Sequence, residues 1–200
     1  MSSREKILNA ITKNKPSEIP LPEKFVGSNE AQNLTEKYLA VLQSIGGKGT
    51  VVADFSEVEN LLTKKLQSGA ELVNCIKELP HYNADVYLTK TPAEVETVQT
   101  VFIRGAFAVA ENSAVWVPEK AMVSRILPFI SQELVMVVEE CNIVANMHEA
   151  YDRINVDEDG YGAFIAGPSK TADIEQSLVI GAHGPLSLQV FILANEKASM

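Results

Sequence analysis

The order of apolar and polar positions predicts alternating helices and strands in the first half of the chain. Apolar residues at helical spacing predict helices around residues 7–11, 34–45 and 58–66, and unbroken apolar runs predict strands at residues 49–55 and 70–76. Ser28 or Asn29 can cap the second helix, and Ser56 with Glu59 forms the capping-box pattern of the third. Because strands that alternate with helices usually pair in parallel, this pattern favours an α/β fold.

The second half is more apolar, and periodicity alone does not separate strand from helix there. The run from Val98 to Val117 is interrupted by Gly105 and by the polar residues 111–113, which favours two strands flanking a turn. Further strands are expected at residues 134–138, 161–166 and 186–193, with a helix at 146–154 and a solvent-exposed turn at 157–160. These elements fit a three-layer α/β/α arrangement.

Three prolines mark a change of organisation near the N-terminus. Pro16, Pro20 and Pro22 exclude a helix interior, so an extended arm should follow the first helix. We therefore predict an N-terminal helix and proline-rich arm over residues 1–27 and a single α/β domain over residues 28–200.

Composition and charge narrow the possible partners. The chain has 200 residues, 46% hydrophobic and 22% charged, which is typical of a globular protein. Its formal net charge of −9 argues against nucleic acid as a main partner, because phosphate binding needs clustered Lys and Arg. The opening residues lack the apolar core of a signal peptide, and no apolar run is long enough to span a membrane. We expect a cytoplasmic protein.

The two cysteines lie far apart in the sequence, at Cys75 and Cys141, and each has apolar neighbours. We expect both to be buried, reduced thiols, as in most cytoplasmic proteins. The His, Cys, Asp and Glu residues show no spacing typical of metal ligands, so we predict neither a metal site nor a cofactor held by this chain alone.

The segment GPSKTADIEQSLVIGAHGP, residues 167–185, is the richest in candidate chemistry. If a helix begins within TADIEQSL, its first backbone N–H groups are unsatisfied and carry partial positive charge. Ser169, Lys170 and Thr171 would then line an anion pocket for a phosphate or a carboxylate. The alternative is that Ser169 or Thr171 only caps the helix while Lys170 is solvated.

Three further polar residues are candidates in the second half. Asp173 and Glu175 would lie in the first turn of that helix, where the macrodipole alone accounts for acidic residues. His183 lies among small residues in a turn that leaves its imidazole accessible, and it is either a catalytic residue or a hydrogen-bonded structural group.

Glu111 closes an apolar run and precedes a polar turn. A carboxylate at the end of a buried strand is partly desolvated, which would suit a general base or nucleophile. The alternative is a hydrogen-bonded structural carboxylate. Trp116, in the next apolar run, is expected to belong to the core.

These motifs resemble those of the lactate utilization protein C family (LutC/YkgG, the LUD domain). There a GPSRTADIE-like segment leads to a VHGP-like turn, and here Lys170 and Ala182 depart from it. Val109-Ala110-Glu111 is similar to the I-A-E of an ADxAIAETGT-like motif, although residues 106 and 112–114 differ. The resemblance implies a fold similar to sugar-phosphate isomerases and CoA transferases. The candidate ligand-binding residues in the first motif are Gly167, Ser169, Lys170, Thr171, Asp173 and Glu175.

The resemblance also implies a function. In that family this subunit works beside two iron–sulfur partner proteins, and together they oxidise L-lactate to pyruvate. Because this chain lacks cluster cysteines, we expect a non-redox subunit that binds a small anion such as a carboxylate. The alternatives are an independent enzyme that acts on a phosphorylated or CoA-linked small molecule through Glu111, and a sensing or scaffold protein without catalysis.

Overall fold

A computed structural model of the protein describes residues 2–20, 22, 33–172 and 178–195. The chain divides into two compact units, residues 1–30 and residues 31–200. The first unit contains helix α1 (Ser3–Lys13), whose first turn is closed by a capping box between Ser2 and Glu5. The predicted apolar residues Ile7, Leu8 and Ile11 lie in this helix, and all three side chains are exposed.

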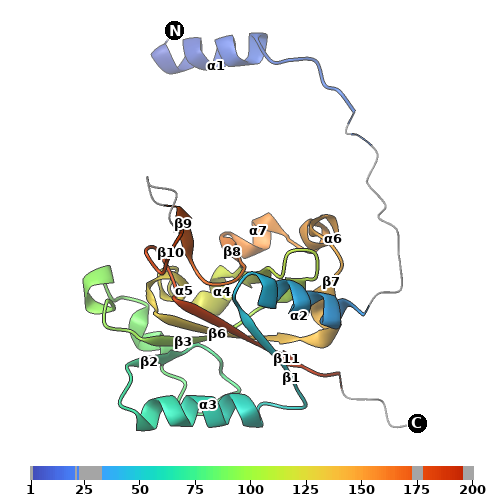
Figure 1. The fold of residues 1–200 in the computed structure, drawn as a ribbon. Helices are drawn as coiled ribbons and strands as arrows, with labels where there is room; N and C mark the ends of the chain where they lie inside the picture. Colours follow the sequence, from blue (N-terminus) through green and yellow to red (C-terminus); the bar gives the residue numbers. More distant parts are fainter. Residues whose placement is uncertain (1, 21, 23–32, 173–177, 196–200) are drawn as a thin grey trace. The chain divides into compact units, whose positions relative to one another are not determined.

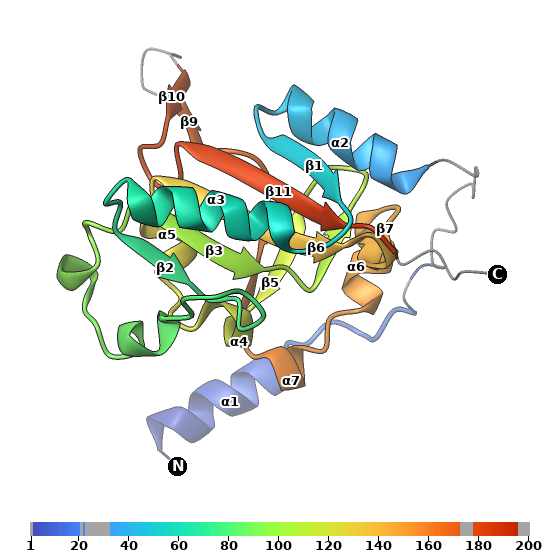
Figure 2. The same cartoon turned by 90° about the horizontal axis from the view of Figure 1, so that it is seen from below.

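A five-stranded parallel sheet forms the centre of the second unit (Figures 1 and 2). Its strands, in spatial order, are β1 (Lys48–Val52), β11 (Ser187–Leu193), β6 (Glu133–Glu139), β3 (Thr100–Arg104) and β2 (Leu72–Asn74). The parallel pairing places the carboxyl ends of β3, β6 and β11 at one edge of the sheet. This arrangement confirms the predicted α/β class.

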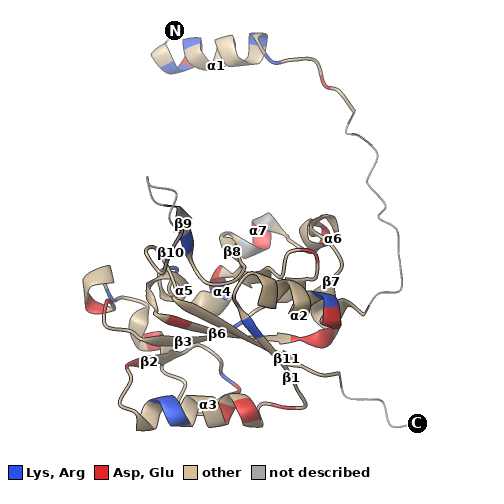
Figure 3. Ribbon diagram, in the orientation of Figure 1, with Lys and Arg blue, Asp and Glu red and all other residues tan. Residues whose placement is uncertain are grey.

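Helices and apolar side chains cover both faces of this sheet, which explains why its strands read as unbroken apolar runs. On one face, Val58 and Leu62 of α3 (Ser56–Gln67) pack with Val135 and Val137 of β6. The alternate residues of β6 point to the other face, where α2 (Leu34–Ser44) packs. α3 begins with acidic and ends with basic side chains, which matches its macrodipole (Figure 3).

A second, four-stranded sheet lies beyond the α2 side of the central sheet (Figure 1). Its order is β7 (Ile143–Val144), β4 (Phe107–Val109), β5 (Val115–Pro118) and β8 (Gly162–Ile165). One of its faces joins the central core, and the other packs Phe107, Trp116 and Phe164 beside α6 (Met147–Asp152). Trp116 is only 9% exposed, so the prediction that it belongs to the core is confirmed.

Short helices and 3₁₀ turns connect these strands. They are η1 (Ala84–Tyr87), η2 (Pro92–Glu94), α4 (Glu119–Met122), α5 (Leu127–Ile130), η3 (Glu140–Asn142) and α7 (Val156–Asp159). In the described part of the chain, no helix is both long and apolar enough to cross a membrane.

Several local predictions were wrong. The run from Val98 to Val117 forms three strands rather than two, because β3 leaves the central sheet at Gly105 and β4 begins in the second sheet. Ser56 lies inside α3 and does not cap it, and its backbone N–H donates instead to the Asp54 carboxylate, 2.8 Å away. The cap of α2 is Asn33; the predicted caps, residues 28 and 29, lie outside the described residues.

The predicted helix after Ser169 is also wrong in its described parts. Residues Lys170–Ala172 form β9 and Leu178–Ile180 form β10, and the two strands pair antiparallel. Residues 173–177, which include Asp173 and Glu175, lie outside the described residues. Thr171 therefore lies in a strand, opposite Val179 of β10, rather than in the open first turn of a helix.

Candidate functional site

The carboxyl edge of the central sheet gathers polar side chains from three strands and the segments that follow them. β3 ends at Arg104, β6 ends at Glu139, and Asn195 comes two residues after the end of β11. Ligands of open α/β sheets usually bind at this edge, because each strand delivers a new loop there. The edge is therefore the first place to look for a site.

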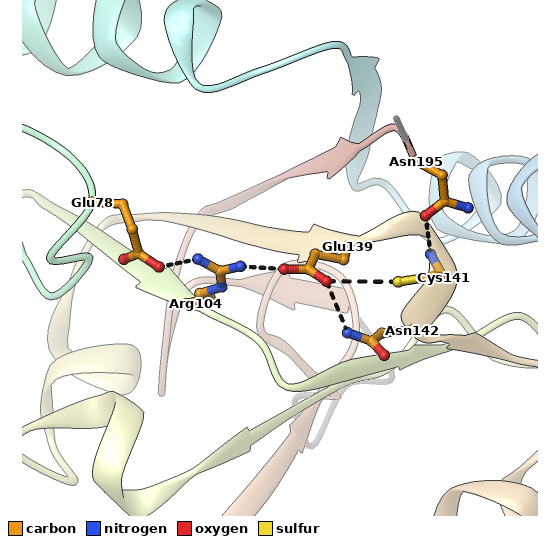
Figure 4. Close-up of polar contacts among 6 residues, drawn as sticks. All are labelled: Glu78, Arg104, Glu139, Cys141, Asn142 and Asn195. Carbon is orange, nitrogen blue, oxygen red and sulfur yellow. Dashed lines mark hydrogen bonds and ion pairs between the residues drawn. The ribbon is translucent and has the colours of Figure 1, made fainter. Parts of the chain in front are cut away.

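Arg104 lies at the centre of this edge, between two carboxylates (Figure 4). Its Nη1 forms an ion pair with Glu78 and its Nη2 forms one with Glu139. The guanidinium carbon also lies 5.8 Å from the centre of the Phe55 ring. All three charged side chains are partly exposed, so both ion pairs can exchange partners with a charged ligand.

Glu139 connects this ion pair to the segment that follows β6. Its second carboxylate oxygen accepts a hydrogen bond from Asn142 Nδ2 at 3.4 Å and lies 3.6 Å from the Cys141 thiol. The backbone N–H of Cys141 donates to Asn195 Oδ1 at 3.1 Å, which ties the end of β6 to the residues after β11 (Figure 4). Glu139 therefore has two further, longer contacts besides its ion pair with Arg104.

A further contact extends this network to helix α2. The backbone N–H of Asn195 donates to Glu140 Oε2 at 3.3 Å, and the hydroxyl of Thr35 donates to Glu140 Oε1 at 2.9 Å. Glu140 therefore anchors the start of α2 to the ends of β6 and β11.

Two cavities lie at this edge, and Arg104 and Glu139 line both of them. The first, of about 230 Å³, extends toward the second sheet and is also lined by Gly105, Ala106, Pro118, Lys120, Ala121 and Asn142. The second, of about 360 Å³, extends toward β1 and β11 and is also lined by Ala53, Asp54, Phe55, Leu193, Ala194 and Asn195. The ion pair therefore forms the wall between two spaces of different chemistry.

The cysteines do not match the sequence prediction. Cys75 is partly buried and close to the carbonyl of Met122, and burial raises the pKa of its thiol to about 12. Cys141, by contrast, is exposed, because it lies in the short turn η3 at the surface end of β6. Both thiols are free, and no group of three His, Cys, Asp or Glu side chains among the described residues could hold a metal ion.

The segment containing the predicted anion pocket lies at the opposite, amino end of β11. The Ser169 N–H donates to the carbonyl of Pro185 at 2.9 Å, and the Gly181 N–H donates to the carbonyl of Ser169 at 3.0 Å. The structure thus brings the GPS turn and the turn containing His183 together. Lys170 and His183 are both exposed. Without the predicted helix start, however, the expected cluster of free amides is absent from residues 169–172.

Gly167 fills a restricted position in this segment. Its φ of +69° suits glycine, and a Cβ there would lie 2.9 Å from the Ile45 side chain at the end of α2. The glycine therefore allows the turn to pack against α2, which accounts for it without a ligand.

Glu111 lies neither at the carboxyl edge of the central sheet nor in the segment around Ser169. It follows β4 in the second sheet, and its carboxylate accepts a hydrogen bond from the Met147 N–H, 2.9 Å away, in the first turn of α6. The side chain is exposed, so the desolvation expected of it was wrong. The reason is that the apolar run before it is buried through backbone pairing and packing of Val109 and Ala110, while the turn itself projects to the surface.

Sequence reasoning missed Arg104, Glu139, Asn142 and Asn195. The available signal was position: the first two end unbroken apolar runs, and the other two follow such runs within three residues. Which of several strand ends would meet depends on the strand order β11-β6-β3, which the one-dimensional pattern does not contain.

Comparisons with known proteins point to one family. The family model of the LUD domain matches residues 83–193. Relatives named lactate utilization protein C from Bacillus pumilus (strain SAFR-032) and Shouchella clausii (strain KSM-K16) are each 30% identical, over 96 and 121 residues. The matches cover 45% and 58% of this chain, and 40% and 51% of those relatives, so the chain matches about half of their length or less.

A solved structure has the same fold. A DUF162 family protein from Deinococcus radiodurans superimposes with a TM-score of 0.59 at 18% identity, over 80% of this chain and 96% of that one. At this identity the likeness concerns the fold.

Proposed function

This chain belongs to the LUD domain family, and from this premise we propose that it acts in L-lactate utilization. In this proposal it is a cytoplasmic, non-redox subunit that binds a small anion and works beside iron–sulfur partner proteins. The observation that carries the proposal is the match to relatives named lactate utilization protein C, which overlaps the LUD domain. The two motifs quoted above, GPSKTADIE and VAE, fall inside the matched range 83–193.

The assignment of electron transfer to partner proteins rests on the cysteine content. Iron–sulfur clusters are usually held by four Cys thiolates. These 200 residues contain two cysteines, one at the end of β2 and one after β6. Clusters that carry electrons from lactate would therefore be held by other chains.

The carboxyl edge of the sheet supports anion binding better than the segment around Ser169. The cavity of about 230 Å³ is lined by two cationic residues, Arg104 and Lys120, by Asn142, and by Glu139, which is paired with Arg104. Within the described residues 169–172, Lys170 is the one cation and is exposed, and residues 170–172 form strand β9 in place of the expected helix start. We therefore place the anion at Arg104 and keep Ser169, Lys170 and Thr171 as the second location.

The alternative of an independent enzyme that uses Glu111 has less support. The carboxylate is exposed and already accepts the Met147 N–H, so it serves the start of α6. Turnover of a phosphorylated or CoA-linked substrate by the purified chain alone would favour this alternative.

A deletion strain tests the proposal. Loss of this protein should slow growth on L-lactate and leave growth on sugars unchanged, and a tagged copy should recover proteins that contain iron and acid-labile sulfide. Complementation with the intact chain is the control. Normal growth on lactate in a clean deletion without a second family member, together with recovery of no iron-containing protein, would contradict the proposal.

A further inference from the structure

We propose that the two cavities beside Arg104 and Glu139 form one bipartite site for a phosphate ester that carries hydroxyl groups. The phosphate binds in the cavity of Lys120, and the hydroxyl groups bind in the cavity of Asp54. The inference concerns the same edge of the sheet as the proposed function and names the class of its anion, but it is tested by binding alone.

The charge of Arg104's surroundings favours a phosphate over a carboxylate. The guanidinium already has two carboxylate partners, Glu78 and Glu139, so an incoming anion must replace one of them. A carboxylate such as lactate offers the same single charge as the group that it displaces. A phosphate ester carries nearly two charges at neutral pH and three acceptor oxygens, so it can engage Arg104 and Lys120 together.

The second cavity has a more acidic lining and suits hydroxyl donors. It shares Arg104 and Glu139 with the first cavity, but its other polar residues are Asp54 and Asn195 in place of Lys120 and Asn142. Hydrogen bonds from the side chain and backbone of Ser56 hold the pKa of Asp54 below its ordinary value, which already lies well below neutral pH. The ionised carboxylate accepts the Ser56 N–H at 2.8 Å and can accept further hydrogen bonds. The partly buried Phe55 ring supplies a flat apolar wall for the carbon skeleton between the hydroxyl groups.

Arg104 and Glu139 connect the two halves. When a phosphate takes over the Nη2 group of Arg104, Glu139 loses its cation but stays positioned by Asn142. Its carboxylate then becomes an acceptor for a ligand hydroxyl on the Asp54 side. Phosphate binding in one cavity thus frees a carboxylate that can accept a hydrogen bond from a hydroxyl group in the other cavity. A molecule that carries both a phosphate and a hydroxyl group therefore binds more tightly than either group alone.

Size supports a ligand larger than lactate. Cavities of about 300 to 1,000 Å³ usually hold ligands of many more atoms than a three-carbon acid. The two spaces measure about 230 and 360 Å³, and a lactate bound at Arg104 would leave the Phe55 side filled with water. A ligand that fills both spaces is therefore larger than lactate.

Calorimetric titration of the full chain with matched probes tests the inference. The probes are inorganic phosphate, glycerol, glycerol 3-phosphate, adenosine, AMP and L-lactate. We expect at least one of the two esters to bind about tenfold or more tightly than inorganic phosphate, since a hydrogen bond to a charged group contributes about that factor. The parent alcohols and L-lactate should bind more weakly than the corresponding ester.

Two conservative variants separate the halves of the site. Lys120→Gln should weaken phosphate and ester alike, whereas Lys64→Gln, the same change at an exposed lysine in the last turn of α3, should leave both unchanged. Asp54→Asn retains an oxygen for the Ser56 N–H, so its fold should persist. It should weaken the ester about tenfold and leave inorganic phosphate unchanged or slightly tighter.

Three results would overturn the inference. The first is that neither ester binds more tightly than phosphate. The second is that Lys64→Gln weakens binding as much as Lys120→Gln. The third is that Asp54→Asn affects phosphate and ester equally. None of these results bears on growth with lactate, so the inference and the proposed function can fail separately.

Discussion

At the scale of single residues, the buried hydroxyl group of Tyr38 in α2 lowers the stability of the fold. Its side chain is 0% exposed, and its hydroxyl oxygen has no hydrogen-bond partner among the described residues. A buried hydroxyl without a partner costs about 1 to 3 kcal/mol. Tyr38→Phe removes the hydroxyl and keeps the ring, so the free energy of unfolding should increase by between zero and about 1 kcal/mol.

Urea unfolding checks this expectation. Tyr38→Leu is the matched control, because it removes the ring as well and should lower the free energy of unfolding by about 1 to 3 kcal/mol through poorer packing. A Phe variant that is less stable by more than about 1 kcal/mol would mean that the hydroxyl does have a partner.

At the scale of elements, the caps of α2 and α3 show that a pattern can predict a helix correctly and its start wrongly. Asn33 Oδ1 accepts the N–H groups of Thr35 and Glu36 at 3.2 and 3.3 Å. Ser56 instead lies inside α3. Asn33→Ala should therefore lower the free energy of unfolding by about 1 kcal/mol, and Ser56→Ala by less than about 0.5 kcal/mol.

Thermal unfolding of the two variants beside the parent protein provides the measurement. If Ser56→Ala lowers the stability as much as Asn33→Ala or more, Ser56 does cap α3, as the sequence predicts. That result would contradict the observed start of α3.

The positions of the strands could be predicted from the sequence where both faces of the strand are buried. β6 and β11 are buried on both faces and read as apolar runs, so their positions followed from the sequence. The break between β3 and β4 depends on close packing instead, because a Cβ at Gly105 would lie 2.2 Å from the Val115 side chain. The sequence of residues 170–180 has hydroxyls and acidic residues suited to a helix start, but residues 170–172 and 178–180 pair as the strands β9 and β10.

At the scale of the whole molecule, the candidate site depends on topology. Arg104 and Glu139 are 35 residues apart in sequence, and Asn195 follows them by more than fifty. They meet because β11, β6 and β3 are parallel neighbours whose carboxyl ends share an edge. No local motif marks such a meeting. The motifs that were visible, around Ser169 and Glu111, lie elsewhere in the fold, where they make hydrogen bonds between turns and at a helix start.

Buried groups that titrate in alkaline solution make the stability of the α/β unit depend on pH. Burial raises the pKa of Cys75 from its ordinary value near 9 to about 12, and burial also raises the pKa of Tyr38. The unfolded chain therefore loses these protons at lower pH than the folded chain. The stability that protonated Cys75 contributes is complete below about pH 9 and is lost as the pH rises toward about 12.

Urea unfolding at several values between about pH 8 and about pH 10.5 should show this loss, with a slope approaching about 1.4 kcal/mol per pH unit for Cys75 alone. The growing negative charge of the whole chain acts in the same direction, so the slope needs a variant that isolates the thiol. Cys75→Ala removes the titrating group and leaves the surface charge unchanged, and its stability should fall less steeply. If the parent protein and Cys75→Ala lose stability with the same slope, the thiol is accessible to water in the folded protein and its proton is held no more tightly there than in the unfolded chain.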